Sequence, residues 1–389
     1  MEKGGISIFI ILFACLMAAC NQTASDTANA GESKTDSLAR EAAPALALDK
    51  IKLPPGFKIE VYAQDIANAR SMDLSPSGVL YVGTMSKGDV YALKDENNDF
   101  KAEKKWTIAT GLKMPNGVAF KDGDLYVAEV SRILKYPAIE TKLDKPEMEV
   151  FYDQYPDKEH HGWKYIAFGP DGNLYVPVGA PCNICEPDDE VFGTITRINM
   201  TSKTRDIVQR GIRNTVGFTW HPETKEMWFT DNGGDWLGED MPSCELNYAP
   251  KDSMNFGYPY CHQGDYPDPK LGKKHACSEF TPPAEKLGAH VAPLGLDYYT
   301  GTMFPEKYRN QLFIAEHGSW NRTKPAGYRV VMVTIEDNMV TSHEVFAEGW
   351  LQGGTAWGRP VDIEFLPDGS MLVSDDYANV IYRISYSGQ

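Results

Sequence analysis

Cationic and amide side chains precede a series of short apolar segments along this 389-residue chain. Arginine binds carboxylates bidentately, and a neutral imidazole accepts protons near physiological pH. If such side chains met in one funnel, an anionic ligand would be favoured there, because a buried charge without a counter-ion is costly. Any one of them alone could be a solvated or capping residue, and it is their recurrence that indicates a site. The set is Arg70, Asn116, His161, Arg213 with Asn214, His290 and Arg359.

A repeated hairpin motif would bring these positions together. A turn rich in Gly, Pro or Asp followed by an apolar strand is typical of a β-hairpin, and one hairpin cannot bury its apolar face alone. Turn glycines Gly78, Gly123 and Gly172 are 45 and 49 residues apart (123 − 78 and 172 − 123), close to a propeller blade of roughly 40 to 50 residues. The six copies are SPSGVLYV (75–82), KDGDLYV (121–127), GPDGNLYV (169–176), HPETKEMWF (221–229), YRNQLFI (308–314) and LPDGSMLV (366–373). The pattern predicts an all-β fold, a six-bladed β-propeller of four-stranded antiparallel blades.

The two ends of the domain alternate apolar and polar residues in the same way. FKIEVY (57–62) precedes the first repeat and VIYRI (380–384) lies near the end of the chain. We expect the first stretch to add the outer strand of the last blade, because this pairing removes exposed edges and locks the ring. The largest gap between repeats, 85 residues from Lys225 to Asn310 (310 − 225), predicts an insertion rich in Gly, Pro and Cys that leaves the sheet.

The N-terminal residues have the composition of a leader. Lys3 precedes an apolar run at 6–19, which at 14 residues is too short to span a bilayer, and Met17-Ala18-Ala19-Cys20 resembles a lipoprotein cleavage site. The alternative is an ordinary signal peptide with an incidental cysteine. We expect a lipoprotein-type signal at 1–20, a flexible tether at 21–50, and one catalytic propeller domain at 51–389 that is exported to the periplasmic or cell-surface side and held to the membrane only by a lipid on Cys20.

The net charge argues against a nucleic-acid partner. Lys and Arg number 38 against 54 Asp and Glu, a formal charge of −16, and no basic run offsets the repulsion from phosphates. An exported enzyme or binding protein fits this composition better.

Five cysteines remain after the leader, and an oxidising compartment favours disulfides among them. Cys182 and Cys185 form a CxxC pair, for which a redox dithiol or half of a zinc site is the alternative, although no second CxxC or HxxxH completes a zinc site. Cys261 and Cys277 flank one loop and are expected to pair. Cys244 is then either free or a rival partner.

Eight stretches in order resemble the sorbosone dehydrogenase-like branch of the soluble quinoprotein sugar dehydrogenases, from about residue 53 to the C-terminus. They are LPPGFKIEVYA, HHGWKYIAFGPDGNLYVPVGAPCNIC, GIRNTVGFTWHP, FTDNGGDWLGEDMPSCELN, NFGYPYCHQGDYPDP, FTPPAEKLGAHVAPLGLDYYTG, FIAEHGSWNR and GRPVDIEFLPDG. The resemblance implies a six-bladed propeller that binds pyrroloquinoline quinone (PQQ) at the channel mouth with Ca²⁺ on the quinone. It also implies oxidation of an aldose or a related hydroxyl or hydrated aldehyde, with electrons passed to a quinone or dye-like acceptor.

The resemblance further implies roles for individual residues. His161 matches the general base, which takes the proton of the substrate hydroxyl while hydride passes to the quinone C5. Arg213, next to Asn214, matches an arginine that polarises the C5 carbonyl as negative charge develops. The remaining cofactor-binding candidates are Arg70 from the funnel set, Arg359 for a cofactor carboxylate, Arg322 in GSWNR as a basic residue that closes over the cofactor, and Trp320 or Trp357 as a planar face.

Calcium is expected on the backbone carbonyls of Gly233 and Gly234 in DNGGDW, because a hard cation takes oxygen ligands. An all-carboxylate site from Asp231, Asp235 and Asp240 is the alternative.

The chain departs from the better-known soluble glucose dehydrogenases at two positions. His160 stands where an Asp precedes the catalytic histidine, so another partner must orient His161, and EHGSWNR does not cleanly match the expected lysine. Extended backbone would place the His160 and His161 side chains on opposite sides. Two other functions remain open: a calcium-dependent lactonase-type propeller, which needs Glu, Asp and Asn side chains around a channel metal, and a non-catalytic carbohydrate- or protein-binding propeller.

Overall fold

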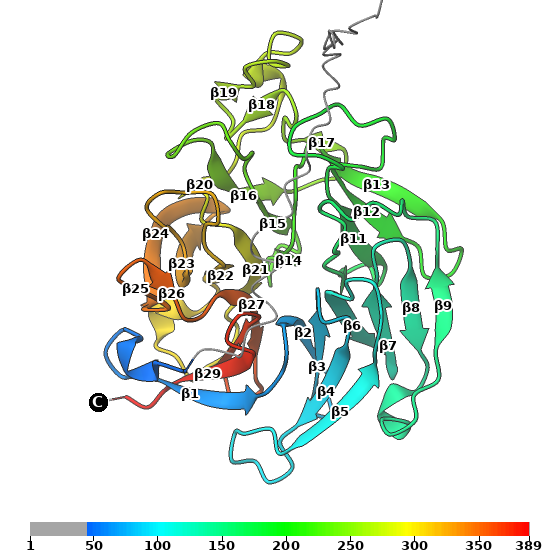
Figure 1. The fold of residues 1–389 in the computed structure, drawn as a ribbon, viewed down its shortest axis with the longest axis vertical. Helices are drawn as coiled ribbons and strands as arrows, with labels where there is room; N and C mark the ends of the chain where they lie inside the picture. Colours follow the sequence, from blue (N-terminus) through cyan, green and yellow to red (C-terminus); the bar gives the residue numbers. More distant parts are fainter. Residues whose placement is uncertain (1–44, 389) are drawn as a thin grey trace, which may run out of the picture.

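Six antiparallel sheets, the blades, surround a central channel in the computed structural model, which describes residues 45–388 (Figure 1). Each blade has four antiparallel strands, and the first three strands of every blade are consecutive in the chain. The predicted six-bladed β-propeller is therefore confirmed.

The strands of blades 1 to 3 are β2 (Ala69–Leu74), β3 (Val79–Thr84), β4 (Val90–Lys94) and β5 (Lys104–Ala109); β6 (Gly117–Lys121), β7 (Asp124–Ala128), β8 (Ile133–Tyr136) and β9 (Glu149–Tyr152); and β10 (Ala167–Phe168), β11 (Leu174–Val178), β12 (Thr194–Ile198) and β13 (Arg205–Arg210). Those of blades 4 to 6 are β14 (Phe218–Trp220), β15 (Met227–Asp231), β16 (Ser243–Ala249) and β20 (Glu285–Ala289); β21 (Pro293–Tyr298), β22 (Leu312–Glu316), β23 (Arg329–Glu336) and β24 (Met339–Glu348); and β27 (Pro360–Phe365), β28 (Met371–Asp375), β29 (Val380–Tyr386) and β1 (Phe57–Gln64).

The apolar half of each sequence repeat is the second strand of its blade. In β11, β15, β22 and β28 every residue is buried, because the neighbouring blades cover both faces of these strands. A short, continuous apolar run is the pattern of such a strand. The turn before it needs a left-handed residue, which Gly78, Gly172 and Gly369 supply at φ of 83°, 76° and 87°.

Strand β1 closes the ring. It pairs antiparallel with β29, with Phe57 opposite Tyr386 and Ile59 opposite Ile384. The last blade therefore combines three strands from the C-terminus with one from the N-terminus, as predicted from the alternating ends. This pairing removes the free edge of β29 and ties the first blade to the last.

The long insertion lies between β16 and β20 of blade 4. It contains β17 (Met254–Asn255), the hairpin of β18 (Cys261–His262) and β19 (Tyr266–Pro267), and the 3₁₀ turn η3 (Cys277–Glu279). Most of it leaves the sheet, as expected, but β17 adds a fifth, parallel strand to β13 of blade 3. Cys261 and Cys277 are joined by a disulfide with a Cα–Cα distance of 5.3 Å, as predicted. The shorter hairpin of β25 (Leu351–Gln352) and β26 (Thr355–Ala356) precedes blade 6, and the 3₁₀ turns η2 (Ile139–Thr141) and η4 (Glu306–Tyr308) lie in blade connections.

The hydrophobic core consists of clusters between adjacent blades. Leu80 and Leu372 belong to the cluster between blades 1 and 6, while Phe313 and Tyr382 belong to the one between blades 5 and 6. A smaller cluster joins residues of the innermost segments across the channel: Val216, Leu294 and Val361, with Trp163 packed against them. We call these four residues the channel plug, because they lie between the two ends of the channel.

The domain begins slightly before the predicted boundary. Leu46, Ala47 and Leu48, assigned to the tether at 21–50, pack against the cluster between blades 5 and 6, and Leu48–Lys50 forms the 3₁₀ turn η1. The predicted signal and Cys20 lie outside the described residues. Within residues 45–388, no helix has the length and apolar character needed to cross a membrane.

Candidate active site at the channel mouth

The first residues of the innermost strands meet at one end of the channel, and the predicted cationic set lies there. Asn116 immediately precedes β6, Arg359 immediately precedes β27, and Arg70 is the second residue of β2. All three are buried, as are His161, Arg213, Asn214 and His290. We call this end the mouth.

His161 is held by the backbone of its own blade. Its Nδ1 lies 3.0 Å from the carbonyl oxygen of Ala180, which requires the Nδ1–H tautomer and leaves Nε2 with a lone pair. Burial lowers the pKa of His161 well below its usual value, and the positive charge of Arg213 lowers it further. The imidazole is therefore neutral near pH 7 and can accept a proton. The Ala180 carbonyl is therefore the group that orients His161, for which the sequence predicted no specific partner.

His160 does not lie opposite His161, so the expectation of an extended segment is wrong. His161 has a φ of 50°, and the two ring centroids are 4.1 Å apart. The left-handed backbone brings both rings to the same side. They differ in exposure instead, because His160 is exposed and His161 is buried.

Arg213 is fixed by four hydrogen bonds from its guanidinium. Nε donates to the Asn183 carbonyl at 2.9 Å and Nη1 to the Asn232 carbonyl at 3.2 Å, while Nη2 donates to Asn183 Oδ1 and to Asp235 Oδ2, both at 2.8 Å. An arginine has five N–H donors, so one N–H on Nη1 is left. Next to it, Asn214 Oδ1 is buried and has no hydrogen-bond partner among the described residues.

Arg70 and His317 share one buried carboxylate. Asp376 accepts a hydrogen bond from Arg70 Nη1 at 2.6 Å and from His317 Nε2 at 2.8 Å. Arg70 also donates from Nε to Asn116 Oδ1 at 2.7 Å. Despite burial, the neighbouring His317, Arg70 and Arg359 hold the pKa of Asp376 far below its usual value, so it is ionised. Burial, together with the charge of Arg359, lowers the pKa of His317 to about 4.

Arg359 is the mouth arginine without a carboxylate hydrogen-bonded to its guanidinium in the described chain. Its Nε donates to the His317 carbonyl at 3.1 Å and its Nη2 to the Gly318 carbonyl, and its guanidinium lies over the Tyr328 ring. The expected convergence of three uncompensated arginines is thus corrected, since Arg70 and Arg213 each have an internal carboxylate partner. The capacity of the mouth for an anion rests mainly on Arg359.

A carboxylate at the end of the second strand anchors the segment entering the first strand. Asp231, the last residue of β15, accepts the backbone N–H of Arg213 at 2.9 Å and of Asn214 at 2.6 Å. Asp375, the last residue of β28, accepts the backbone N–H of Arg359 at 2.9 Å. Burial raises the pKa of Asp231 to about 6 and that of Asp375 to about 7. These acids position the mouth residues through hydrogen bonds to their backbone.

The two candidate tryptophans lie in different surroundings. Trp357 packs against Trp350 and Tyr382 in the core, and its Nε1 donates to the Gly349 carbonyl at 2.8 Å. Its ring is therefore held mainly by core contacts, and its role as a planar face for the cofactor stays a prediction. Trp320 is 45% exposed and forms an edge-to-face pair with Trp236, with ring centroids 5.3 Å apart.

Arg322 and the Gly233–Gly234 turn lie on the same side of the mouth as Trp320. Arg322 donates from Nη2 to Asp240 at 2.6 Å, while its Nε is buried and has no partner among the described residues. His290 contacts the Gly238 carbonyl through Nε2 at 2.7 Å. The Gly233 and Gly234 carbonyls accept no hydrogen bond within residues 45–388, which is compatible with a cation there. The carboxylates of the alternative set, Asp231, Asp235 and Asp240, each accept hydrogen bonds from other protein groups, and they are not among the described groups whose ligand atoms lie within 4.8 Å of one another.

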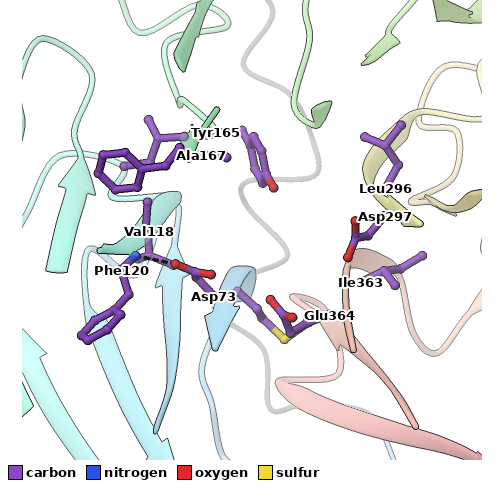
Figure 2. A pocket seen from close by; sticks show the side chains of 13 residues that line it. Asp73, Val118, Phe120, Tyr165, Ala167, Leu296, Asp297, Ile363 and Glu364 are labelled. Atoms are coloured by element: carbon purple, nitrogen blue, oxygen red, sulfur yellow. Dashed lines mark hydrogen bonds between the residues drawn. The ribbon is translucent and has the colours of Figure 1, made fainter. Parts of the chain in front are cut away.

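The opposite end of the channel is acidic. A cavity of about 300 Å³ there is lined by Asp73 from β2, Asp297 from β21 and Glu364 from β27, and the Tyr165 hydroxyl points into it (Figure 2). Burial raises the pKa of Asp73 to about 7 and of Asp297 to about 6, and it raises the pKa of Glu364 well above its usual value. We call this end the floor. The channel plug separates it from the mouth.

The sequence analysis does not predict every residue of the mouth. His317 and Asp376 are absent from the predicted set, although the second-strand ends AEH and SDD both place acids at this edge. Asn183 is also absent from it, although it lies between the two cysteines of the CxxC pair. The disulfide between Cys182 and Cys185 is present, with a Cα–Cα distance of 6.2 Å, and Cys244 is buried and unpaired in the described chain.

Fold and site together define a class: a six-bladed propeller with arginines and a neutral histidine at one channel mouth. The chain matches the TrAA12-like family model over residues 51–387 and belongs to that family. A Borreliella burgdorferi protein, described as uncharacterized, is 34% identical over 354 residues, covering 86% of this chain and 91% of that protein.

Solved structures share the fold at low sequence identity. The calcium structure of the Trichoderma reesei carbohydrate-active enzyme of family AA12 has a TM-score of 0.76 and 19% identity, covering 87% of this chain and 97% of that one. The holo PQQ domain of pyranose dehydrogenase from Coprinopsis cinerea has a TM-score of 0.74 and 16% identity, covering 88% and 98%. PQQ-bound aldose sugar dehydrogenase from Streptomyces coelicolor has a TM-score of 0.61 and 18% identity, covering 86% and 100%.

Proposed function

We propose that this protein is a PQQ-dependent oxidoreductase that oxidises an aldose, or a related hydroxyl or hydrated aldehyde, and passes the electrons to a quinone or redox-protein acceptor. The observation that carries the proposal is the pairing, at one mouth, of a buried neutral His161 with an Arg359 whose guanidinium has no carboxylate hydrogen-bonded to it in the described chain. The PQQ-bound states of the Coprinopsis and Streptomyces structures add support.

The residues of the mouth fit PQQ. The cofactor is planar and carries three carboxylates, which arginine binds well. Arg359 and the buried Nε of Arg322 have donors to spare, and Asn214 Oδ1 is a buried acceptor without a partner in the described chain. Trp320 offers an exposed ring, and the carbonyls of Gly233 and Gly234 are available to Ca²⁺.

The chemistry divides between cofactor and protein. When bound, PQQ supplies a quinone that accepts two electrons from the substrate carbon. His161, with Nδ1–H directed at Ala180, accepts the hydroxyl proton at Nε2. Arg213 holds a fixed positive charge beside this histidine, where it keeps the imidazole neutral before the reaction and stabilises developing negative charge during it.

Reconstitution tests the proposal. Purified protein treated with a chelator should gain a stoichiometric absorbance change when PQQ and Ca²⁺ are added together. It should then reduce a redox dye with at least one member of an aldose panel. Mg²⁺ in place of Ca²⁺ is the control. A protein that neither binds PQQ nor responds to chelation would contradict the proposal.

The lactonase alternative has less support in the structure. It requires acidic side chains that converge on one metal in the channel. Among the described residues, the one group of three metal-ligating side chains whose ligand atoms lie within 4.8 Å of one another is Asp95, Asp99 and Glu103. These residues lie between β4 and β5 at the outside of blade 1, away from the channel.

Export and anchoring are proposed from the sequence. A mature protein that begins at a lipidated Cys20 would act on the non-cytoplasmic side of a membrane, bound through its lipid alone. Intact-mass analysis of protein extracted from membranes tests this. An unmodified N-terminus at another residue would contradict it.

A further inference from the structure

Asn183 occupies the centre of a four-residue loop closed by the Cys182–Cys185 disulfide. The loop lies between β11 and β12 of blade 3 and reaches across to blade 4. The side-chain Oδ1 of Asn183 accepts hydrogen bonds from Arg213 Nη2 at 2.8 Å and from the Asp235 backbone N–H at 2.9 Å. Its Nδ2 donates to the Asp235 carbonyl at 2.9 Å, and its own carbonyl accepts Arg213 Nε at 2.9 Å. Asn183 is thus hydrogen-bonded both to Arg213 and to the backbone of Asp235, the carboxylate partner of Arg213.

The amide is chemically suited to this position. It needs an acceptor for two donors and, on the same group, a donor for the Asp235 carbonyl, which an ionised carboxylate cannot provide. The amide divides these roles between two atoms, Oδ1 for the two donors and Nδ2 for the carbonyl. A carboxylate would also place a second negative charge beside Arg213, whose charge Asp235 already compensates at 2.8 Å. An amide orients the guanidinium without removing its positive field.

A tyrosine from the insertion supports the loop from behind. The Tyr258 hydroxyl donates to the Asn183 carbonyl at 3.3 Å and accepts the Cys185 backbone N–H at 3.2 Å. Tyr258 is itself buried. The disulfide and the two hydrogen bonds to Tyr258 both restrain the loop, so Asn183 has little freedom to move.

We infer that Asn183 is a positioning residue for Arg213, and that the Cys182–Cys185 loop with Tyr258 is the brace that holds it. The inference rests on the proposed role of Arg213 at the mouth. Asn183 contributes to three of the four hydrogen bonds that orient Arg213. It accepts two of them itself, and it fixes the backbone of Asp235, whose carboxylate accepts the third. The N–H that remains on Nη1 is thereby aimed by Asn183.

The main test is Asn183→Ala, with Asn199→Ala as the matched control. Asn199 caps a turn of the same blade through hydrogen bonds to the backbone of Thr201 and Ser202, and it is remote from the mouth. In the reconstituted enzyme, Asn183→Ala should lower kcat by about 10- to 100-fold with KM changed much less, because misplacing a catalytic group costs rate rather than binding. Asn199→Ala should leave both unchanged.

A second readout does not depend on turnover. The groups that face His161 are the charged Arg213 and the titratable His160, and the Ala180 carbonyl accepts its Nδ1–H. Asn183→Ala keeps the backbone carbonyl that accepts Arg213 Nε but removes the side-chain bonds to Nη2 and to Asp235. If the guanidinium then shifts away from His161, the pKa of His161 should rise part of the way toward its usual value, since burial still lowers it. NMR titration of the full chain without cofactor measures this pKa. A protein that merely loses stability would not show this shift. If the wild type fails to turn over while the shift is present, the proposed function fails and the positioning role stands.

Tyr258→Phe covers the case in which Asn183→Ala does not fold. Removing one hydroxyl should move kcat and the pKa of His161 in the same directions by a smaller amount. The inference is overturned if Asn183→Ala folds and matches Asn199→Ala in kcat and in the pKa of His161. It is equally overturned if only Tyr258→Phe folds and both quantities match those of the wild type.

Discussion

Both ends of the channel bury ionisable side chains, but the pKa of Asp376 is lowered at the mouth, whereas the pKa values of the acids at the floor are raised. At the mouth, ionised groups persist because they compensate one another, as Asp376 and Arg70 do, while the neutral His317 donates a second hydrogen bond to the same carboxylate. At the floor, Asp73, Asp297 and Glu364 have no cation hydrogen-bonded to them among the described residues, and burial raises their pKa values. The mouth therefore contains ionised groups, whereas the floor acids keep their protons to a higher pH than free carboxylic acids do.

This difference in pKa between mouth and floor is related to the apolar residues that lie between the two ends. Val216, Leu294, Val361 and Trp163 form an apolar cluster between the two ends. Among the described residues, no mouth arginine is hydrogen-bonded to Asp73, Asp297 or Glu364. An ionised carboxylate without a partner in such surroundings is unfavourable, and it takes up a proton instead. The mouth can therefore act on a charged ligand, while the floor responds to pH.

The largest expected effect is on catalysis at the mouth. His161→Gln removes the proposed proton acceptor, so turnover should fall by about 10²- to 10⁴-fold, the scale of general base catalysis. PQQ affinity should change little, because other residues bind the cofactor carboxylates. Steady-state kinetics and a PQQ titration of the reconstituted enzyme measure both quantities.

His160→Gln is the control for this prediction. His160 is exposed and lies beside His161, so its loss should reduce turnover only a few-fold. A larger loss in His160→Gln than in His161→Gln would move the base to the other histidine.

The next effect concerns compensation of charge at the mouth. Asp376→Asn removes the carboxylate that is hydrogen-bonded to Arg70, which should cost about 3 kcal/mol of unfolding free energy at pH 7, as for other broken buried pairs. Because the pKa of Asp376 is lowered in the folded state, its stabilisation exists above the unfolded pKa and is lost as pH falls through the folded pKa. Urea unfolding at pH 7 and at lower pH should show the gap to wild type narrowing below about pH 4. A gap independent of pH would argue against the ionised carboxylate.

The smallest effect has the opposite sign and comes from the floor. The pKa of Asp297 is raised to about 6, so the folded protein keeps a proton that the unfolded chain releases near pH 4, and stability falls as pH rises through this window. Asp297→Asn avoids that loss and should stabilise the protein at pH 7.5, on the order of 1 kcal/mol, but not at pH 4. Thermal unfolding at both pH values measures this. A destabilised Asp297→Asn at pH 7.5 would contradict the protonated floor.

Much of the architecture could be predicted because its signals are local. Turn glycines, apolar second strands and alternating ends each occupy fewer than about ten residues, as strands do, and they led to six blades and the closure by β1. The position of the mouth residues followed from this repeat, since residues at equivalent places in each blade meet at one end of the channel. Both disulfides were predicted from spacing and compartment.

The state of each mouth residue was decided by contacts between distant segments. Arg70 and Asp376 are 306 positions apart, and Arg213 and Asn183 come from different blades, so no local pattern shows that these groups are paired. Trp357 and Trp320 look alike in the sequence, but neighbouring strands bury one and leave the other exposed. The sequence by itself determined which residues reach the channel, because strand periodicity is a property of the chain. Only the tertiary structure decided which of them keep a charge, because compensation and burial depend on what the other blades bring alongside.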